Sequence, residues 1–134
     1  LVSCGGRGNA EGVLRATRAV MRDPRWRDAF RGMRKPYFFH RPDPYADWLK
    51  KAGFQATAAR LVPKEMLLAH RTAFVGWVRT TWIPYTQRLP EPLREEFVHA
   101  VVDRYLARHP VDAAGRVRVG MVRLEVDALL RAGT

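Results

Sequence analysis

The sequence predicts an α/β fold, or α+β if the chain stands alone, with about three strands and four to five helices. Three observations support this class. Of the 134 residues, 47% are hydrophobic, which is enough for one domain with an ordinary core. Segments with apolar residues at helical spacing alternate with segments rich in β-branched residues. Only the first crossover places helices between two strands in the way that suggests a parallel pair.

The first third of the chain predicts a strand, a glycine loop and a helix. Residues 1–4 have the character of the end of a buried strand, and residues 5–9 form the loop after it. In residues 10–21 the apolar side chains recur at helical spacing, with arginines on the other face. The side chain of Asn9 can cap this helix, and a short second helix is expected to run through Trp26.

The next segment predicts a connection and a helix with clear boundaries. Residues 35–44 contain three prolines and must connect two elements, and the adjacent aromatic residues 37–39 within them need cover. Asp43 is expected to cap the following helix, with Pro44 at its first position. Gly53 is expected to end that helix in the left-handed conformation.

A second strand and a helix follow. Residues 54–62 predict a strand that is broken or bent at Pro63, and residues 66–69 continue it. Residues 72–82 predict a helix, which residues 83–85 interrupt.

The last third holds the strongest helix and the longest strand. Residues 92–108 carry an apolar stripe at helical spacing and predict the helix, and residues 111–115 predict a turn. Residues 117–128 predict a strand whose apolar alternation changes phase near Gly120. A strand buried on both faces would show this change, and so would a bulge.

The net charge of +11 raises the question of nucleic-acid binding. The 20 arginines and four lysines are spread along the whole chain, with acidic residues among them. No recognition-helix pattern, zinc spacing or aromatic-and-basic strand motif occurs in the sequence. The charge therefore indicates a solvated, arginine-rich surface, and a role in nucleic-acid binding is not favoured.

The sequence also indicates the cellular compartment of the protein. The sequence has no run of about 18 apolar residues that could span a membrane, and its first residues lack the layout of a signal peptide. The single cysteine, Cys4, fits a reducing cytosol and is expected to be a buried strand residue. These observations predict a cytoplasmic protein with no membrane partner.

No pattern assigns a catalytic residue or a metal ligand. No histidine has metal-ligand spacing with an Asp, Glu or Cys, and each is expected at the surface, at a cap or at a helix end: His40, His70, His99 and His109. No residue stands out as a general base, so the catalytic residues stay unknown and no metal is expected.

One motif resembles a known family. Leu49, Ala52, Gly53 and Phe54 match the pattern L-x-x-A-G-F, which in class I S-adenosylmethionine-dependent methyltransferases marks the helix before the sixth strand. The glycine loop of residues 5–9 resembles the loop after the fifth strand. By the order and spacing of these signals, the chain resembles the C-terminal half of this family.

The second half of the chain narrows the resemblance. Residues 74–81, 84–85 and 89–90 are similar to the helical insertion of the trans-aconitate methyltransferase-like group. The resemblance implies that residues 1–134 are the C-terminal segment of a methyltransferase domain, with a helical acceptor-side insertion over about 71–109.

The resemblance implies a Rossmann-like sheet in which the last strand is antiparallel and central, between the other two. In this family the glycine-rich loop after the first strand and an acidic residue ending the second hold the cofactor. The chain contains neither feature in its proper context. The expectation is therefore a truncated piece, inactive alone, of an enzyme that uses S-adenosylmethionine, with no cofactor bound by this chain itself.

A methyltransferase acting on a small acid must hold a carboxylate, which arginine, tyrosine, tryptophan and backbone amides can do. Open α/β sheets bind ligands at loops after their strands, so Gly6, Arg7 and Asn9 are candidate substrate-binding residues. The alternative is a tight turn in which Asn9 only caps a helix.

The helical insertion supplies the other candidates. Trp77, Trp82 and Tyr85 could wall an acceptor pocket, and Arg79, like Arg7, could pair with a carboxylate. The alternative for these aromatic residues is ordinary core packing of an amphipathic helix.

Two other functions stay open. The chain could be a stand-alone binding domain derived from this fold, in which the exposed edge of the strand at residues 1–4 forms a homodimer. It could also be a basic nucleic-acid-binding protein, which salt-dependent binding would reveal. A small-molecule acceptor remains the favoured partner, and its chemical identity is not encoded in any motif.

Overall fold

The computed structural model describes residues 1–133 of the chain. These residues divide into two compact units, which we call the sheet unit and the helical unit. The sheet unit contains Leu1–Ala10, Tyr37–Glu65 and Gly120–Thr134, and the helical unit contains Glu11–Pro36 and Met66–Val119. Each unit is described by itself.

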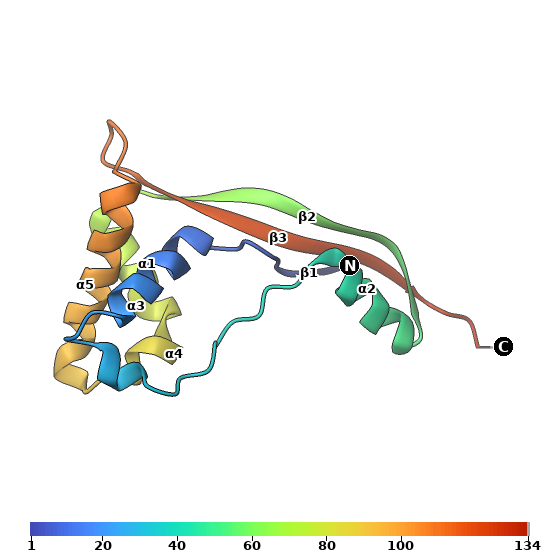
Figure 1. Ribbon diagram of the computed structural model, residues 1–134. Coiled ribbons are helices and arrows are strands. Elements are labelled where there is room, and N and C mark those ends of the chain that lie inside the picture. Colours follow the sequence, from blue (N-terminus) through green and yellow to red (C-terminus); the bar gives the residue numbers. More distant parts are fainter. Residues whose placement is uncertain (134) are drawn as a thin grey trace. The chain divides into compact units, whose positions relative to one another are not determined.

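Three strands form one sheet in the order β1-β3-β2 (Figure 1). They are β1 (Val2–Gly5), β2 (Phe54–Leu68) and β3 (Val117–Leu130). The class is therefore α+β, and the last strand of the chain lies in the middle of the sheet.

The direction of each pairing follows from its hydrogen bonds. β1 runs antiparallel to β3, with Val2 opposite Val126. On the other side of β3, the Arg131 amide donates to the Gly53 carbonyl at 2.9 Å, and the Thr57 hydroxyl donates to the Asp127 carbonyl at 3.2 Å. As residue numbers rise along β2, the numbers of their partners fall along β3, which is the antiparallel pattern. β1 and β2 therefore run in the same direction on either side of β3.

Burial along β3 changes phase within the strand. Val117 and Val119 are buried, then Leu124 and Val126, while Arg118 between the first two is exposed. A strand with both faces buried is therefore the wrong interpretation of the sequence pattern. Each half buries one face, and the buried positions switch from odd to even numbers after Gly120, where the chain passes from one unit to the other.

β2 is continuous from Phe54 to Leu68, so the strand is not broken at Pro63, and the continuation expected over residues 66–69 is present as far as Leu68. The strand lies at an edge of the sheet, where prolines are tolerated more often than in central strands. β1 is also an edge strand, and this placement corrects the expectation for Cys4, which is exposed rather than buried.

Helix α2 (Pro42–Lys51) belongs to the sheet unit and begins two residues earlier than expected. Pro42 takes the first helical position, which suits its fixed φ, so the cap residue is Arg41 rather than Asp43. Gly53 follows the helix with a φ of +89°, in the left-handed conformation that the sequence predicted.

The aromatic residues in the connection before α2 are only partly buried. The rings of Tyr37 and Phe39 stack with centroids 6.0 Å apart, and both are half-buried. Phe38 between them is 67% exposed. The prediction that all three adjacent aromatics need cover is therefore wrong for Phe38.

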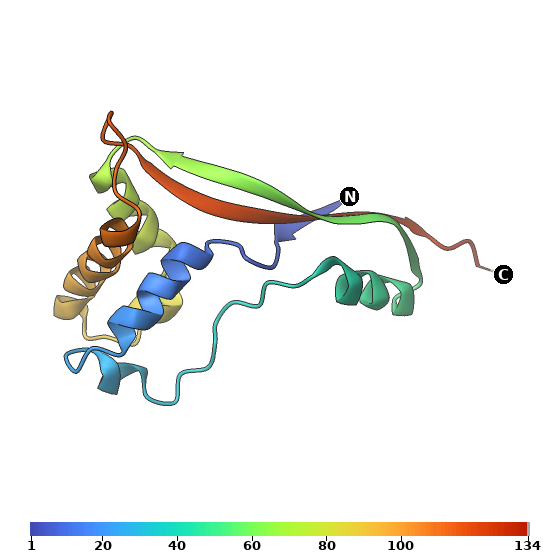
Figure 2. The same ribbon diagram turned by 45° about the horizontal axis from the view of Figure 1, so that its top comes forward.

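The helical unit contains the other helices (Figure 2). They are α1 (Glu11–Met21), a 3-10 turn η1 (Arg27–Phe30), α3 (Arg71–Thr81), α4 (Ile83–Thr86) and α5 (Glu91–Arg108). The helices expected at 10–21, 72–82 and 92–108 are present within one residue at each end. The expected break at 83–85 is instead a separate helical turn, α4, with Pro84 in its first turn.

One apolar core fills the helical unit. Phe97 on α5 is fully buried, and its ring lies 5.6 Å from that of Trp26 and 5.1 Å from that of Phe30. Thr17 is fully buried on α1 without losing its hydrogen bonds. Its hydroxyl donates to the Val13 carbonyl at 2.8 Å and accepts from Trp82 Nε1, also at 2.8 Å. This pair of bonds joins α1 to the junction of α3 and α4.

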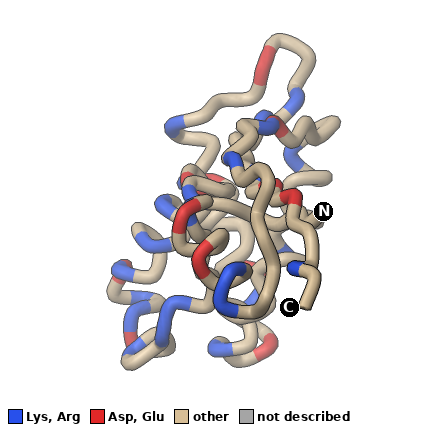
Figure 3. The backbone as a smooth tube through the Cα atoms, turned by 90° about the vertical axis from the view of Figure 1, so that its right-hand side faces the viewer, with Lys and Arg blue, Asp and Glu red and all other residues tan. Residues whose placement is uncertain are grey.

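Charged residues occur in every part of the described chain, with acidic residues interleaved among the basic ones (Figure 3). Among residues 1–133, no helix is both long enough and apolar enough to cross a membrane.

Candidate functional site

The loop after β1 uses its backbone amides internally. The Gly6 amide donates to the Val122 carbonyl at 2.9 Å, and the Arg7 amide donates to the His40 carbonyl at 3.0 Å. The Asn9 amide closes the loop on the Gly6 carbonyl at 2.9 Å. A loop that cradles an anion needs such donors free. As it is folded, this loop does not present these three amides to a ligand.

The glycines of this loop allow close packing. A Cβ atom at Gly6 would lie 2.5 Å from Leu61 Cδ2 and 3.0 Å from Leu124 Cβ. A Cβ atom at Gly5 would lie 2.7 Å from Phe39 Cε1. A side chain at Gly6 would therefore require Leu61 to shift, and one at Gly5 would require Phe39 to shift, so these glycines allow the loop to pack closely against the chain's own side chains.

Asn9 has a different role from the helix cap expected of it. Its side-chain oxygen accepts from the Val122 amide at 2.9 Å, which fixes the loop to β3 rather than to the first turn of α1. Ala10 separates it from the helix with a φ of +51°, so the chain turns sharply before α1 begins. Gly6 and Asn9 therefore set the backbone of the loop.

Arg7 is the residue of this loop that remains available. Its side chain is exposed, and among residues 1–133 its guanidinium makes no ion pair or hydrogen bond. Guanidinium groups bind carboxylates through two parallel hydrogen bonds. Arg7 therefore remains a candidate carboxylate partner, and the residues around it hold its backbone in place.

The aromatic candidates of the helical unit form a row. The Trp77 and Trp82 ring centroids are 5.1 Å apart, and those of Trp82 and Tyr85 are 6.0 Å apart. Tyr85 is only 5% exposed, so core packing describes it better than a pocket wall does. Trp77 is half-buried and keeps part of its ring accessible.

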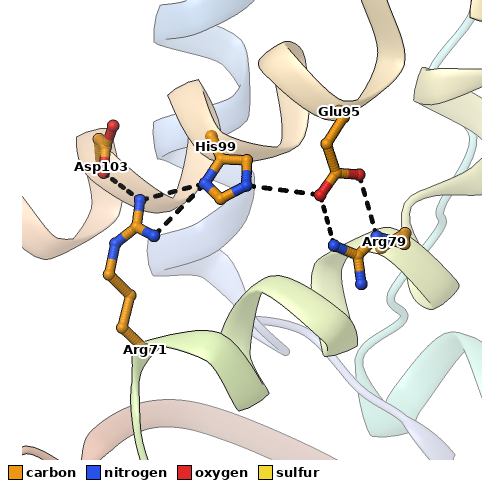
Figure 4. Close-up of polar contacts among 5 residues, drawn as sticks. All are labelled: Arg71, Arg79, Glu95, His99 and Asp103. Carbon is orange, nitrogen blue, oxygen red and sulfur yellow. Dashed lines mark hydrogen bonds and ion pairs between the residues drawn. The ribbon is translucent and has the colours of Figure 1, made fainter.

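Arg79 is already bound to a carboxylate of the same unit. Its Nε donates to Glu95 Oε2 at 3.0 Å, and its Nη2 donates to Glu95 Oε1 (Figure 4). The hydrogen bond from Arg79 lowers the pKa of Glu95 below that of an ordinary glutamate. A ligand carboxylate would have to displace Glu95 to reach this guanidinium.

The contacts of Glu95 extend into a network between α3 and α5 (Figure 4). Glu95 Oε1 lies 3.4 Å from His99 Nε2, and both terminal nitrogens of Arg71 lie 3.3 Å from His99 Nδ1. Arg71 also donates to Asp103 Oδ1 at 2.6 Å. We call these four residues, together with Arg79, the α3–α5 network.

The network fixes the proton of His99. An arginine can only donate, so His99 Nδ1 accepts from Arg71 and Nε2 carries the proton toward Glu95. Both ring nitrogens are engaged, so His99 is not placed to act as a general base toward a ligand. The α3–α5 network therefore joins two helices rather than forming a catalytic pair.

The network was not predicted from the sequence, although a signal for it exists. Glu95, His99 and Asp103 follow one another at intervals of four residues, which puts them on one face of a helix. Among residues 1–133, no group of three or more His, Cys, Asp or Glu side chains could hold a metal ion.

No protein-family model matches the chain. No curated protein matches its sequence either. The candidate residues fall into one group in each unit: Gly6, Arg7 and Asn9 in the sheet unit, and Trp77, Arg79 and Tyr85 in the helical unit.

Proposed function

We propose that this chain forms the acceptor-side part of an S-adenosylmethionine-dependent methyltransferase that acts on a small molecule, with a carboxylic acid as the favoured acceptor class. The sheet order β1-β3-β2 is the main support. The last strand lies between two strands that run opposite to it, which is the arrangement that the resemblance to this family implies.

Local structure adds support at the motif itself. Gly53, within the A-G-F segment, has a φ of +89° and separates α2 from β2. The glycine therefore serves the helix-to-strand turn that the resemblance assigns to it.

Arg7 is the residue on which acceptor binding depends in this proposal. It follows β1 and extends from a loop whose backbone is held by Gly6 and Asn9. The loop thus fixes the backbone from which an unpaired guanidinium can reach a carboxylate. Trp77 supplies an accessible aromatic surface in the helical unit, while Tyr85 and Arg79 serve its internal packing and pairing.

The described residues do not fit the cofactor. The amides of Gly6, Arg7 and Asn9 are already bound to carbonyls of the chain, and the nearby glycine positions are filled by neighbouring side chains. The proposal therefore requires that other residues of the same enzyme hold S-adenosylmethionine.

This requirement gives the test. In the reading frame that contains this chain, the codons before Leu1 should encode a glycine-rich strand-loop-helix segment with an acidic residue about 20 positions further on. The protein made from the whole frame should bind S-adenosylmethionine saturably in a calorimetric titration, and the 134-residue chain should not. A frame without that segment, or saturable binding by the 134-residue chain, would contradict the proposal.

One observation favours a second function, dimerisation through a strand edge. β1 pairs only with β3 among the described strands, and Leu1 beside it is 84% exposed. Gly6 donates toward β3 and Arg7 donates away from it to His40, so by alternation the Ser3 and Gly5 amides also face away from β3. An open row of donors of this kind can pair with another chain.

A further inference from the structure

The helical unit contains a cavity of about 210 Å³ between α1 and α5 that no proposed function uses. Five arginines and one histidine line it: Arg15, Arg18, Arg22, Arg104, Arg108 and His109. No Asp or Glu is among its lining residues. We call it the basic cavity.

Helix geometry gathers these side chains. Arg15, Arg18 and Arg22 are spaced three and four residues apart on α1, and Arg104 and Arg108 are four apart on α5. Residues at these spacings lie on one face of a helix. The two basic faces meet at the same cavity because α1 and α5 pack against each other.

Small residues on α1 make the space. Ala16 and Ala19 line the cavity between the arginines, and Gly12 lies at one side of it. A Cβ atom at Gly12 would lie 3.0 Å from the Tyr105 ring, so the two helices are in close contact at that point. The cavity is therefore bounded by packed backbone and an aromatic ring rather than by mobile side chains alone.

Four of the five arginines of the basic cavity have no acidic partner among residues 1–133. Arg18 pairs with Glu11, but the side chains of Arg15, Arg22, Arg104 and Arg108 make no ion pair with any of residues 1–133. Like charges held on facing helices repel one another, and that repulsion is relieved when an anion binds between them.

Three of the four carboxylates of α5 are paired outside the basic cavity, and the fourth, Glu91, does not line it. Glu95, Glu96 and Asp103 pair with arginines outside the basic cavity, which are Arg79, Arg25 and Arg71 respectively. Helix α5 thus has one face where acids and arginines balance and another where arginines stand alone. Arg104 and Arg108 on the second face have no acidic partner among residues 1–133.

We propose that the basic cavity binds a small ligand carrying two or more phosphate groups. Guanidinium groups bind phosphate oxygens through paired hydrogen bonds, and one carboxylate would occupy only one of the five arginines. A cavity of about 210 Å³ has room for linked phosphate groups but not for a folded macromolecule. This proposal does not depend on the methyltransferase proposal.

Calorimetric titration of the 134-residue chain with inorganic tripolyphosphate tests the proposal. The variant R15Q/R108Q removes two unpaired charges from the cavity, and the control R27Q/R41Q removes two arginines that lie outside it and have no ion pair among residues 1–133. We expect saturable one-to-one binding that weakens by about tenfold or more in R15Q/R108Q and by less than about twofold in the control. No saturable binding, or an equal loss in both variants, would overturn the proposal.

Two further measurements test the location of the site and the alternative that its ligand is a nucleic acid. In spectra of the unsubstituted chain, tripolyphosphate should move the backbone amide resonances of residues 12–22 and 104–109 more than the others, which tests the site without any variant. A single-stranded oligonucleotide serves as the competitor. If it displaces tripolyphosphate and binds more tightly at the same salt concentration, the ligand is a nucleic acid and the small-ligand proposal is wrong.

Discussion

Thr17 shows at the scale of one residue how a polar group is tolerated in the core. Its hydroxyl has a donor and an acceptor within 2.8 Å while the residue is fully buried. The substitution Thr17→Val keeps the shape but removes the acceptor of Trp82 Nε1–H. We expect it to lower the free energy of unfolding by about 1–3 kcal/mol.

Chemical denaturation followed by tryptophan fluorescence measures this loss. Thr17→Ser is the control, because it keeps the hydroxyl and removes only a methyl group, which costs about 1 kcal/mol. A valine variant that is as stable as the unsubstituted chain would show that the hydrogen bond to Trp82 contributes nothing.

The ion pair of Glu95 predicts a pH dependence. Arg79 lowers the pKa of Glu95 in the folded chain, so the pair stabilises the fold above the pKa of an unfolded glutamate, about 4.3, and this stability is lost as the pH falls through the lower folded pKa. Both side chains are about half exposed, so the effect is screened by solvent and small.

We expect Glu95→Gln to reduce the difference in unfolding free energy between pH 7 and pH 3. Glu91→Gln is the matched control, since Glu91 lies on the same helix and has no ion pair among residues 1–133. Equal changes in both variants would mean that the Arg79 contact has no specific role.

The proposed activity gives a testable prediction for Arg7. In the protein made from the whole reading frame, Arg7→Ala should raise the KM for a carboxylic acid acceptor by about tenfold or more, because a charge-assisted hydrogen bond is worth about 1.5–3 kcal/mol. Binding of S-adenosylmethionine should be unchanged. An unaltered KM would remove Arg7 from the acceptor site and leave the fold assignment untouched.

At the scale of elements, two glycines predict opposite effects of the same substitution. Gly53 has a φ of +89°, where a side chain is strained, so Gly53→Ala should destabilise the chain by about 1 kcal/mol. Gly76 lies within α3 with open space around it, so Gly76→Ala should stabilise the chain by about 0.5–1 kcal/mol. Thermal unfolding of the two variants measures both, and shifts of the same sign would contradict the assignment of Gly53 to a left-handed turn.

Helix positions could be predicted from the sequence because apolar spacing and turn residues are local signals. α1, α3 and α5 begin and end within one residue of the expected ranges. The exposure of Cys4 and the continuity of β2 at Pro63 have one physical cause. An apolar segment looks the same in sequence whether its strand is central or at an edge, and only the pairing decides whether a side chain is buried or a proline is tolerated.

The candidate site could be predicted less well, because side-chain partners come from distant parts of the chain. Asn9 bonds to Val122, 113 residues away in sequence, so its helix-cap role could not be tested by local pattern. Arg79 and Glu95 meet only because α3 packs on α5. The basic cavity could not be predicted for the same reason, because the arginines are spread along the sequence and only the packing of α1 against α5 gathers five of them.

At the scale of the whole molecule, the free edge of β1 predicts self-association. Light scattering at increasing concentration should show a dimer, and Ser3→Pro should return it to a monomer, because proline removes an amide that faces away from β3. Ser3→Ala keeps the amide and should remain dimeric. A chain that is monomeric at high concentration would argue against dimerisation through this edge.

The phase change in β3 makes the length of the chain between Val119 and Leu124 a determinant of the fold. Side chains alternate with a period of two, so deleting one residue there would bring Val119 and Leu124 into the same alternation. One half of β3 could then keep its buried side chains inward only if the other half turned its own buried side chains outward. Deletion of Gly120 is therefore expected to destabilise the fold far more than deletion of Ala113 in the turn at residues 111–115. Neither deletion removes a buried side chain.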